Sequence, residues 1–273
     1  MRPKLFAFDL DGTLLTTGKR LSERNRDALI DMSRRGAVIA LASGRLRSSM
    51  VQYAHSLGIN PAMLTLNGAA VFSDHTENSK IIYHAPLAST YADSLIAYAA
   101  GKDFAINYYI DNELHSSRSE VNARWIDLYH QQTGTKYHFL EDMSVLAGRS
   151  PSKVIFVGEP RRLDSIEDQF RRRWKNDIYI VRTWEYYLEF LCRDANKARG
   201  LHALARSLHI DLKDVVAFGD AENDIPMLRE VGLGIAVHNA SDIVKKSAHY
   251  VSPWTNDEDA VAREWERMKK KFD

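Results

Sequence analysis

The sequence predicts an α/β fold, a doubly wound (Rossmann-like) parallel-sheet core that carries an inserted α+β domain. Three observations support this prediction. Short apolar runs alternate with helical patterns at both ends of the chain. Polar signatures follow the apolar runs directly, and ligands bind at the carboxyl ends of the strands in such sheets. The middle of the chain instead gathers aromatic residues and several strand-like segments.

Apolar segments predict the strands of the core, and amphipathic segments predict its helices. Ser22 and Gly36 have the residue types of an N-cap and a C-terminal stop for the helix between them. The continuous apolar run at residues 37–42 is typical of a parallel strand covered on both faces. We expect core strands at residues 5–8, 37–42, 62–66, 215–218 and 234–237, and helices at 22–35, 197–208 and 225–231, with another helix ending near 58 and one closing the chain.

The middle of the chain predicts a separate domain. Its aromatic residues lie mostly on expected strands, where such residues more often belong to a core than to a binding surface. We expect strands at residues 104–110, 153–157, 178–182 and 186–191, and helices at 120–132 and 161–174. The predicted division is therefore a core domain of residues 1–84 and 191–273, with residues 85–190 inserted into it.

Composition excludes several classes of protein. The 273 residues carry a net charge of +1, which offers no electrostatic case for binding nucleic acid or an anionic membrane. The one cysteine, Cys192, cannot form an intramolecular disulfide. No apolar stretch is long enough to span a bilayer, and the N-terminus does not resemble a signal peptide. We expect a cytoplasmic protein, and no feature indicates an obligate protein partner.

The first motif with chemical content is Asp9-Leu10-Asp11-Gly12-Thr13, which follows an apolar strand. Carboxylates two residues apart lie on the same side of an extended chain. They repel each other and stay ionised most easily with a cation between them. The alternative is an acidic turn that caps the next helix. The buried strand before the motif favours a functional role.

Two further motifs are weaker when each is considered alone. Ser43-Gly44-Arg45 follows the second strand, where a hydroxyl and free backbone amides can bind an anion, although Ser43 could also be a simple N-cap. Lys197 lies at an expected helix start, a position where the helix dipole disfavours a cation. A lysine there is usually solvated surface, so this misfit is only a hint of another role.

The fourth motif, Gly219-Asp220-Ala221-Glu222-Asn223-Asp224, again follows an apolar strand. Three acids and an amide within five residues suit a hard cation with oxygen ligands. An acidic helix N-terminus would explain one or two of these acids. It does not explain a pair of acidic turns in one chain, each placed directly after a buried strand.

Together the four motifs resemble those of the haloacid dehalogenase-like superfamily, in particular its Cof-type branch, which has an inserted α/β cap. The resemblance implies that Asp9 is the nucleophile and that Asp11 is the general acid and base. It implies a Mg²⁺ ion held by Asp9, the Asp11 backbone carbonyl and Asp220, with Asp224 at or behind the first shell. The residues implied to hold the phosphoryl oxygens are Leu10, Ser43, Gly44, Lys197 and Asn223.

The function implied by this resemblance is a Mg²⁺-dependent phosphatase that acts on sugar phosphates or similar small phosphorylated metabolites. The phosphoryl group would pass through an aspartyl phosphate on Asp9, and the inserted domain would select the substrate. Two alternatives stay open. One is a phosphohexomutase of the same fold, and the other is a non-catalytic module that binds a phosphorylated ligand. Loss of Asp9 or Asp11 would be typical of the second alternative, and the chain keeps both.

Overall fold

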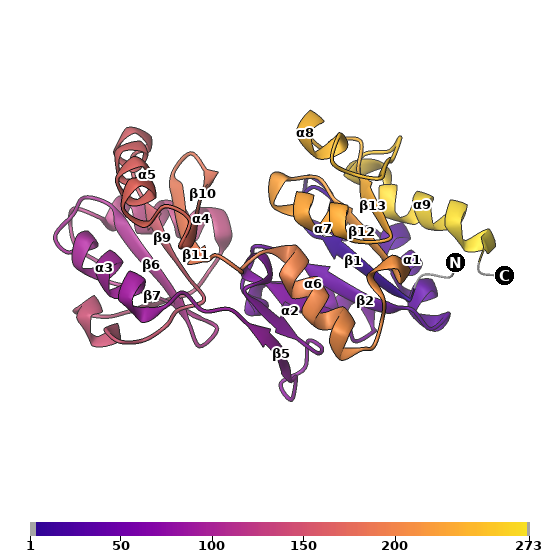
Figure 1. Cartoon of the computed structure of the whole chain (residues 1–273), viewed down its shortest axis with the longest axis horizontal. Coiled ribbons are helices and arrows are strands. Elements are labelled where there is room, and N and C mark those ends of the chain that lie inside the picture. Colours follow the sequence, from indigo (N-terminus) through magenta and orange to yellow (C-terminus); the bar gives the residue numbers. More distant parts are fainter. Residues whose placement is uncertain (1–3, 272–273) are drawn as a thin grey trace. The chain divides into compact units, whose positions relative to one another are not determined.

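The computed structural model describes residues 4–271, which form two compact units (Figure 1). Unit 1 contains residues 4–84 and 196–271, and unit 2 contains residues 85–195. Unit 2 thus ends five residues beyond the expected boundary at residue 190. The cause is the last strand of unit 2, β11 (Tyr187–Cys192), which stays paired with that unit's sheet as far as Cys192. Among residues 4–271, no helix is both long and apolar enough to cross a membrane.

Unit 1 is built on an eight-stranded sheet with the strand order β14-β13-β12-β1-β2-β3-β4-β5. The six strands from β14 to β3 are all parallel. In sheet order the strands are β14 (Tyr250–Val251), β13 (Leu233–Ala236), β12 (Val215–Gly219), β1 (Leu5–Asp9), β2 (Val38–Ala42), β3 (Ala62–Thr65), β4 (Ala70–Phe72) and β5 (Ile81–His84).

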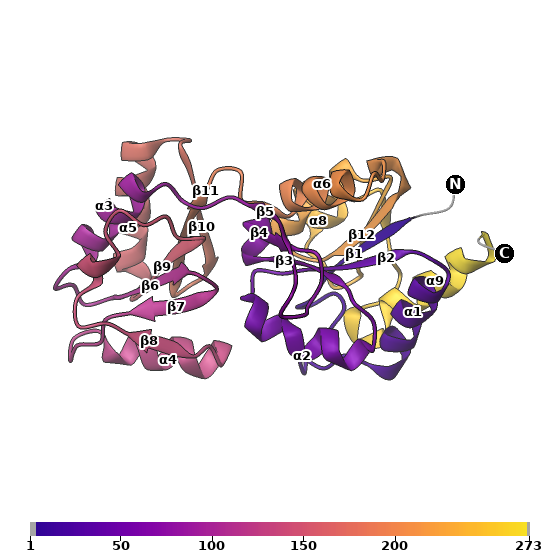
Figure 2. The ribbon, with the colours of Figure 1, turned by 90° about the horizontal axis from the view of Figure 1, so that it is seen from below.

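Helices cover both faces of this sheet, as a doubly wound fold requires (Figure 2). Alternate side chains of β1 divide between two cores: Phe6 and Phe8 belong to one, and Leu5 and Ala7 to the other. The first core includes α1 (Glu23–Arg34), α2 (Arg47–Leu57) and α9 (Ala260–Met268). The second includes α6 (Lys197–Ser207), α7 (Ile225–Glu230) and α8 (Asp242–Lys245).

The local signals expected for the first helix are confirmed. Ser22 caps α1, and its side chain accepts a hydrogen bond from the Asn25 amide. Gly36 follows the helix with a φ of +86°, which favours glycine.

One edge of the sheet differs from the expected parallel arrangement. β4 runs antiparallel to β3, and β5 runs antiparallel to β4. The reason is a tight 3-10 turn over Leu66–Gly68, in which Asn67 and Gly68 have φ angles of +57° and +84°. This turn reverses the chain directly after β3, so the sheet is mixed. Asn-Gly is a sequence that promotes such a turn, because both residues tolerate positive φ.

Unit 2 is a six-stranded sheet in the order β10-β11-β9-β6-β7-β8, with helices on both faces. Its strands are β6 (Ala105–Ile110), β7 (Glu113–Ser116), β8 (Tyr137–Phe139), β9 (Lys153–Val157), β10 (Ile178–Trp184) and β11. Its helices are α3 (Ser89–Ala99), α4 (Ala123–Thr133) and α5 (Pro160–Trp174). The sequence patterns missed α3, β7 and β8, because the two strands are very short and α3 has only a weakly amphipathic pattern.

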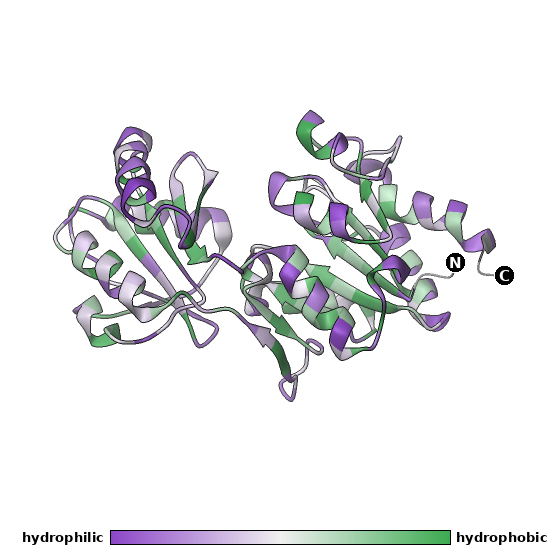
Figure 3. Cartoon of the chain, viewed as in Figure 1, coloured by the Kyte–Doolittle hydropathy of each residue, from purple (hydrophilic) through white to green (hydrophobic). Residues whose placement is uncertain are grey.

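The aromatic residues of unit 2 mostly form its core, as predicted. The ring of Phe190 contacts those of Phe156 and Phe170 between the sheet and α5. On the other face, Tyr129 of α4 packs against Tyr187 and shares a short hydrogen bond with Tyr109. Figure 3 shows the same partition along the chain, with apolar strands inside and polar outer faces on α5 and α9.

Candidate active site

The carboxyl ends of β1 and β12 bring two of the predicted motifs together. These strands are parallel neighbours, with Phe8 beside Phe218, so the residues that follow them emerge at the same edge of the sheet. The order of the sheet also reverses here, because β2 lies on one side of β1 and β12 on the other. A Cβ atom on Gly219 would lie 2.5 Å from the Cβ atom of Asp224, so only glycine allows this close approach.

Three carboxylates gather at this edge. Asp9, Asp220 and Asp224 each have an oxygen within 4.8 Å of the others. The Lys197 ammonium donates to Asp9 Oδ1 and to Asp224 Oδ1, both at 2.5 Å. Lys197 and Asp224 are fully buried, and Asp9 is nearly so. This explains why a lysine lies at the start of α6, where the helix dipole disfavours a cation: its ammonium pairs with two buried acids.

The charges of this cluster do not balance. When all three carboxylates are ionised, three negative charges face one positive charge, which leaves two negative charges in a buried place. Burial raises the pKa of Asp9, and the nearby charges of Asp224 and Asp220 add to this rise against the effect of Lys197. Burial also raises the pKa of Asp220 to about 6, although a hydrogen bond from Thr13 opposes the rise. The cluster therefore favours a bound divalent cation.

The two oxygens of Asp224 are both engaged within the protein. Oδ1 accepts from Lys197, and Oδ2 accepts from the backbone amides of Asp220 and Ala221 at 3.0 and 3.1 Å. Asp220 has one oxygen tied to the Thr13 hydroxyl at 2.7 Å, which leaves its other oxygen for a ligand. Asp224 thus acts as a support for the loop and for Lys197 more than as an open ligand.

Asp11 lies outside this cluster and has a different partner. Arg45 donates to both of its carboxylate oxygens, at 2.7 Å from Nε and 2.5 Å from Nη2. Burial alone would raise the pKa of Asp11, but the hydrogen bonds and charge of Arg45 outweigh burial and lower it. The Asp11 carboxylate is 45% exposed, so it stays accessible from solvent. Sequence analysis placed Arg45 in a motif without assigning it this role.

A loop after β3 connects the remaining motifs. Asn67 donates its backbone amide to the Ser43 carbonyl at 2.9 Å, and its side-chain oxygen accepts from Asn223 at 2.8 Å. The Asn67 side chain also lies beside Gly44, where an added Cβ would meet it at 3.1 Å. Asn67 therefore links the second motif to the fourth. The sequence signal for it was the Asn-Gly pair after a buried strand.

The same loop contacts the start of α6. A Cβ on Gly68 would lie 2.3 Å from the Asn196 carbonyl oxygen, so the two backbones touch at this point. Asn196 caps α6, and its side chain accepts from the Arg199 amide. The cap makes Lys197 the first helical residue, as the sequence predicts.

Two more asparagines hold the loop after β1. Asn239 donates to the Gly12 carbonyl at 2.7 Å and accepts from the Asn256 amide at 2.9 Å. Asn256 in turn donates to the Leu15 carbonyl at 2.9 Å. Gly12 itself has a φ of +82°, and a Cβ there would lie 2.4 Å from an Asp220 oxygen. These contacts define the geometry of the loop that follows Asp9 and carries Asp11.

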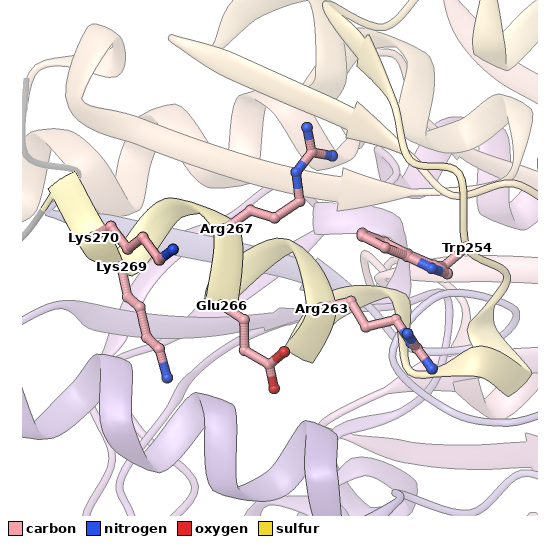
Figure 4. Close-up of a pocket in the computed structure, with 6 residues that line it drawn as sticks. All are labelled: Trp254, Arg263, Glu266, Arg267, Lys269 and Lys270. Carbon is pink, nitrogen blue, oxygen red and sulfur yellow. The ribbon is translucent and has the colours of Figure 1, made fainter.

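A separate hollow of about 590 Å³ lies along α9 and contains none of these residues. Its cationic side chains do not converge, because Arg267 and Lys269 extend to opposite sides of the helix and Arg263 lies farther along it (Figure 4). We therefore place the candidate active site at the acidic cluster.

Comparison with known proteins identifies the family of the chain. A sequence model of the haloacid dehalogenase-like hydrolases matches residues 6–264. The chain belongs to this family. A crystal structure of such a hydrolase from Bacteroides thetaiotaomicron is 29% identical, with a TM-score of 0.88, and covers 98% of this chain and 100% of that chain. A crystal structure from Thermotoga maritima is 28% identical, with a TM-score of 0.88 and coverage of 98% and 97%.

Curated relatives of this hydrolase are phosphatases. A phosphatase of Bacillus subtilis is 27% identical and covers 95% of this chain and 97% of its own length. The 5-amino-6-(5-phospho-D-ribitylamino)uracil phosphatase of the same organism is 27% identical, with coverage of 95% and 93%. The HMP-PP phosphatase of Serratia proteamaculans is 27% identical, with coverage of 92% and 95%. The hydrolase is therefore a phosphatase, which acts on phosphoric monoesters.

Proposed function

We propose that this phosphatase hydrolyses small phosphorylated metabolites, sugar phosphates or similar monoesters, through an aspartyl phosphate on Asp9, and that it requires Mg²⁺. The observation that carries the proposal is the buried cluster of three carboxylates around one lysine at the end of β1. Such a cluster lowers stability unless a bound cation balances its charge, because buried like charges repel.

The donor set of the cluster fits Mg²⁺. All donors are oxygens, the net charge of two negative charges matches a divalent cation, and Mg²⁺ prefers few carboxylates together with water and phosphate. Asp9 and Asp220 would hold the ion together with the backbone carbonyl of Asp11. Asp224 would support it from behind, because its oxygens already serve Lys197 and two backbone amides. The bound ion would neutralise phosphate charge beside Asp9.

The first chemical step forms a bond between an Asp9 carboxylate oxygen and phosphorus, while the bond from phosphorus to the substrate oxygen breaks. Asp11 supplies the proton that the leaving oxygen takes up. In the structure Arg45 favours the ionised form of Asp11. The acid role therefore requires that Asp11 separate from Arg45 and take a proton when substrate binds.

The second step hydrolyses the aspartyl phosphate. Asp11, now ionised, removes a proton from water, the water oxygen bonds to phosphorus, and the bond from phosphorus to Asp9 breaks. Arg45 suits this step, because its two hydrogen bonds hold Asp11 in the ionised form and in one orientation.

The phosphoryl oxygens would be held by Lys197, by the Ser43 hydroxyl and by the amides of Leu10 and Gly44, which match the charge that grows in the transition state. Asn223 is the fifth proposed group. Its amide nitrogen donates to Asn67, and its buried carbonyl oxygen has no partner within residues 4–271. The Asn223 amide has two N–H donors, so one can stay bonded to Asn67 while the other donates to phosphate.

Unit 2 is proposed to select the substrate. The relatives that match over at least 92% of this chain include phosphatases named for different substrates. Replacing residues 85–195 with the equivalent segment of one such relative should change the preferred substrate. The replacement should leave phosphate transfer to Asp9 intact. An unchanged substrate preference in a folded chimera would contradict this role.

The decisive experiment measures phosphate release from p-nitrophenyl phosphate with and without Mg²⁺, for the wild type and for Asp9→Asn. We expect Mg²⁺-dependent turnover that the substitution abolishes while circular dichroism shows an intact fold. Retention of more than a trace of activity would overturn the nucleophile assignment. Analysis of products from a hexose phosphate then separates a hydrolase, which releases phosphate, from a mutase, which returns it to the sugar.

A further inference from the structure

Two histidines and one glutamate meet at an edge of the unit 2 sheet, on β7 and β8 (Figure 2). Glu113 and His115 are two residues apart on β7, so their side chains lie on the same face. His138 on the parallel strand β8 is the register partner of His115. The strand pairing therefore places all three side chains together. The phosphatase mechanism proposed above uses none of them.

The carboxylate of Glu113 lies between the two imidazoles. Its Oε2 is 3.4 Å from His115 Nε2, and its Oε1 is 3.8 Å from His138 Nε2. The two ring centroids are 5.5 Å apart. With metal–nitrogen bonds of about 2.0–2.1 Å, two imidazoles on one tetrahedral ion would have centroids roughly 5.2 Å apart. Among residues 4–271, only the ligand atoms of the aspartate cluster already lie within 4.8 Å of one another, so the two imidazoles must rotate toward each other to bind one ion with Glu113.

We propose that Glu113, His115 and His138 form a binding site for a first-row transition-metal cation, with Zn²⁺ as the representative ion. Imidazole nitrogens suit such ions, whereas Mg²⁺ prefers oxygen ligands, so this site and the aspartate cluster select different metals. Three protein ligands leave a fourth position for water. The stoichiometry is one ion per chain.

The surrounding backbone holds the ligands in place. β6 and β7 are joined by a two-residue turn, Asp111 and Asn112, whose φ angles of +52° and +62° indicate a type I′ hairpin. Glu113 follows this turn directly. β8 has three residues and lies at the sheet edge, where β7 is its one neighbour in the sheet order. A bound ion would therefore tie this short edge strand to the rest of unit 2.

The exposure of the three side chains allows an ion to enter the site, and one feature of His115 limits the affinity of the site for that ion. The side chains of Glu113 and His138 are 48% and 45% exposed, and that of His115 is 16% exposed. The Nδ1 atom of His115 is buried and has no hydrogen-bond partner in the described part of the chain. Metal-bound histidines usually donate this second N–H to an acceptor, and its loss weakens binding about 10–100-fold. We therefore expect an exchangeable ion in place of a permanent structural one.

The alternative is a simple surface ion pair between Glu113 and protonated histidines, which has little effect on stability. Equilibrium dialysis against Zn²⁺ in excess Mg²⁺ distinguishes the two, because Mg²⁺ occupies the aspartate cluster. We expect the wild type to bind one Zn²⁺ more than His115→Asn/His138→Asn. Glu113→Gln should bind that ion at least tenfold more weakly, since it removes one of three ligands.

The matched control is His55→Gln/His75→Gln. These two rings also lie close together, with centroids 4.8 Å apart, but neither ring forms an ion pair with a carboxylate of residues 4–271. This control should bind Zn²⁺ as the wild type does. Equal Zn²⁺ binding by the wild type and by His115→Asn/His138→Asn, both shown to be folded by circular dichroism, would overturn the proposal. So would an unchanged affinity in Glu113→Gln.

Discussion

Replacing Lys197 with methionine tests the electrostatic logic of the site most directly. The substitution keeps most of the side-chain volume and removes the charge. It leaves Asp9 and Asp224 buried without the ammonium that now lies 2.5 Å from each. Removing one partner of a buried ion pair destabilises a protein by about 3–5 kcal/mol. Lys197 and Asp224 are fully buried, so we expect a loss in this range.

Urea unfolding in EDTA, followed by circular dichroism, measures this loss. With an m-value of about 3 kcal/mol per molar urea, the transition midpoint should fall by about 1 M or more. Excess Mg²⁺ should restore part of the stability, because a divalent cation beside Asp9 replaces the lost positive charge. The variant should also lack phosphatase activity.

Lys213→Met is the matched control. Lys213 also pairs with an aspartate, Asp211, at 2.9 Å, but the two side chains are 62% and 54% exposed. Its midpoint should stay at the wild-type value, because water screens an exposed pair. A decrease below about 0.3 M for Lys197→Met, comparable with this control, would refute the claim that the cluster depends on a buried counter-charge.

Three other outcomes are expected. Arg45→Met should lower kcat for phosphate release at least tenfold with KM less affected, because Asp11 loses both hydrogen bonds that orient it; an unchanged kcat would contradict this. Gly68→Ala should lower the urea midpoint far more than Gly134→Ala. Both glycines have positive φ, but only at Gly68 would the added Cβ lie 2.3 Å from a backbone atom. Removing divalent cations with EDTA should abolish turnover and Mg²⁺ should restore it; activity in EDTA would exclude the metal requirement.

The sequence by itself determined the local features of this protein. Apolar runs marked β1, β2 and β12, and Ser22 marked the start of α1, because strand periodicity and helix capping depend on neighbouring residues. The acidic turns after β1 and β12 were visible for the same reason. Their convergence at one sheet edge followed from the general rule that parallel strands share a carboxyl edge.

The tertiary structure decided which of these groups meet. Arg45 pairs with Asp11 across 34 residues, and Asn67 connects to Asn223 across 156, so no local pattern could show either contact. The place of β11 in its sheet likewise depends on pairing with β9, from which α5 and β10 separate it in the chain. Side-chain partners and sheet edges are set by strand order and register. Those arise only when the whole chain packs, because partners such as β1 and β12 lie far apart in sequence.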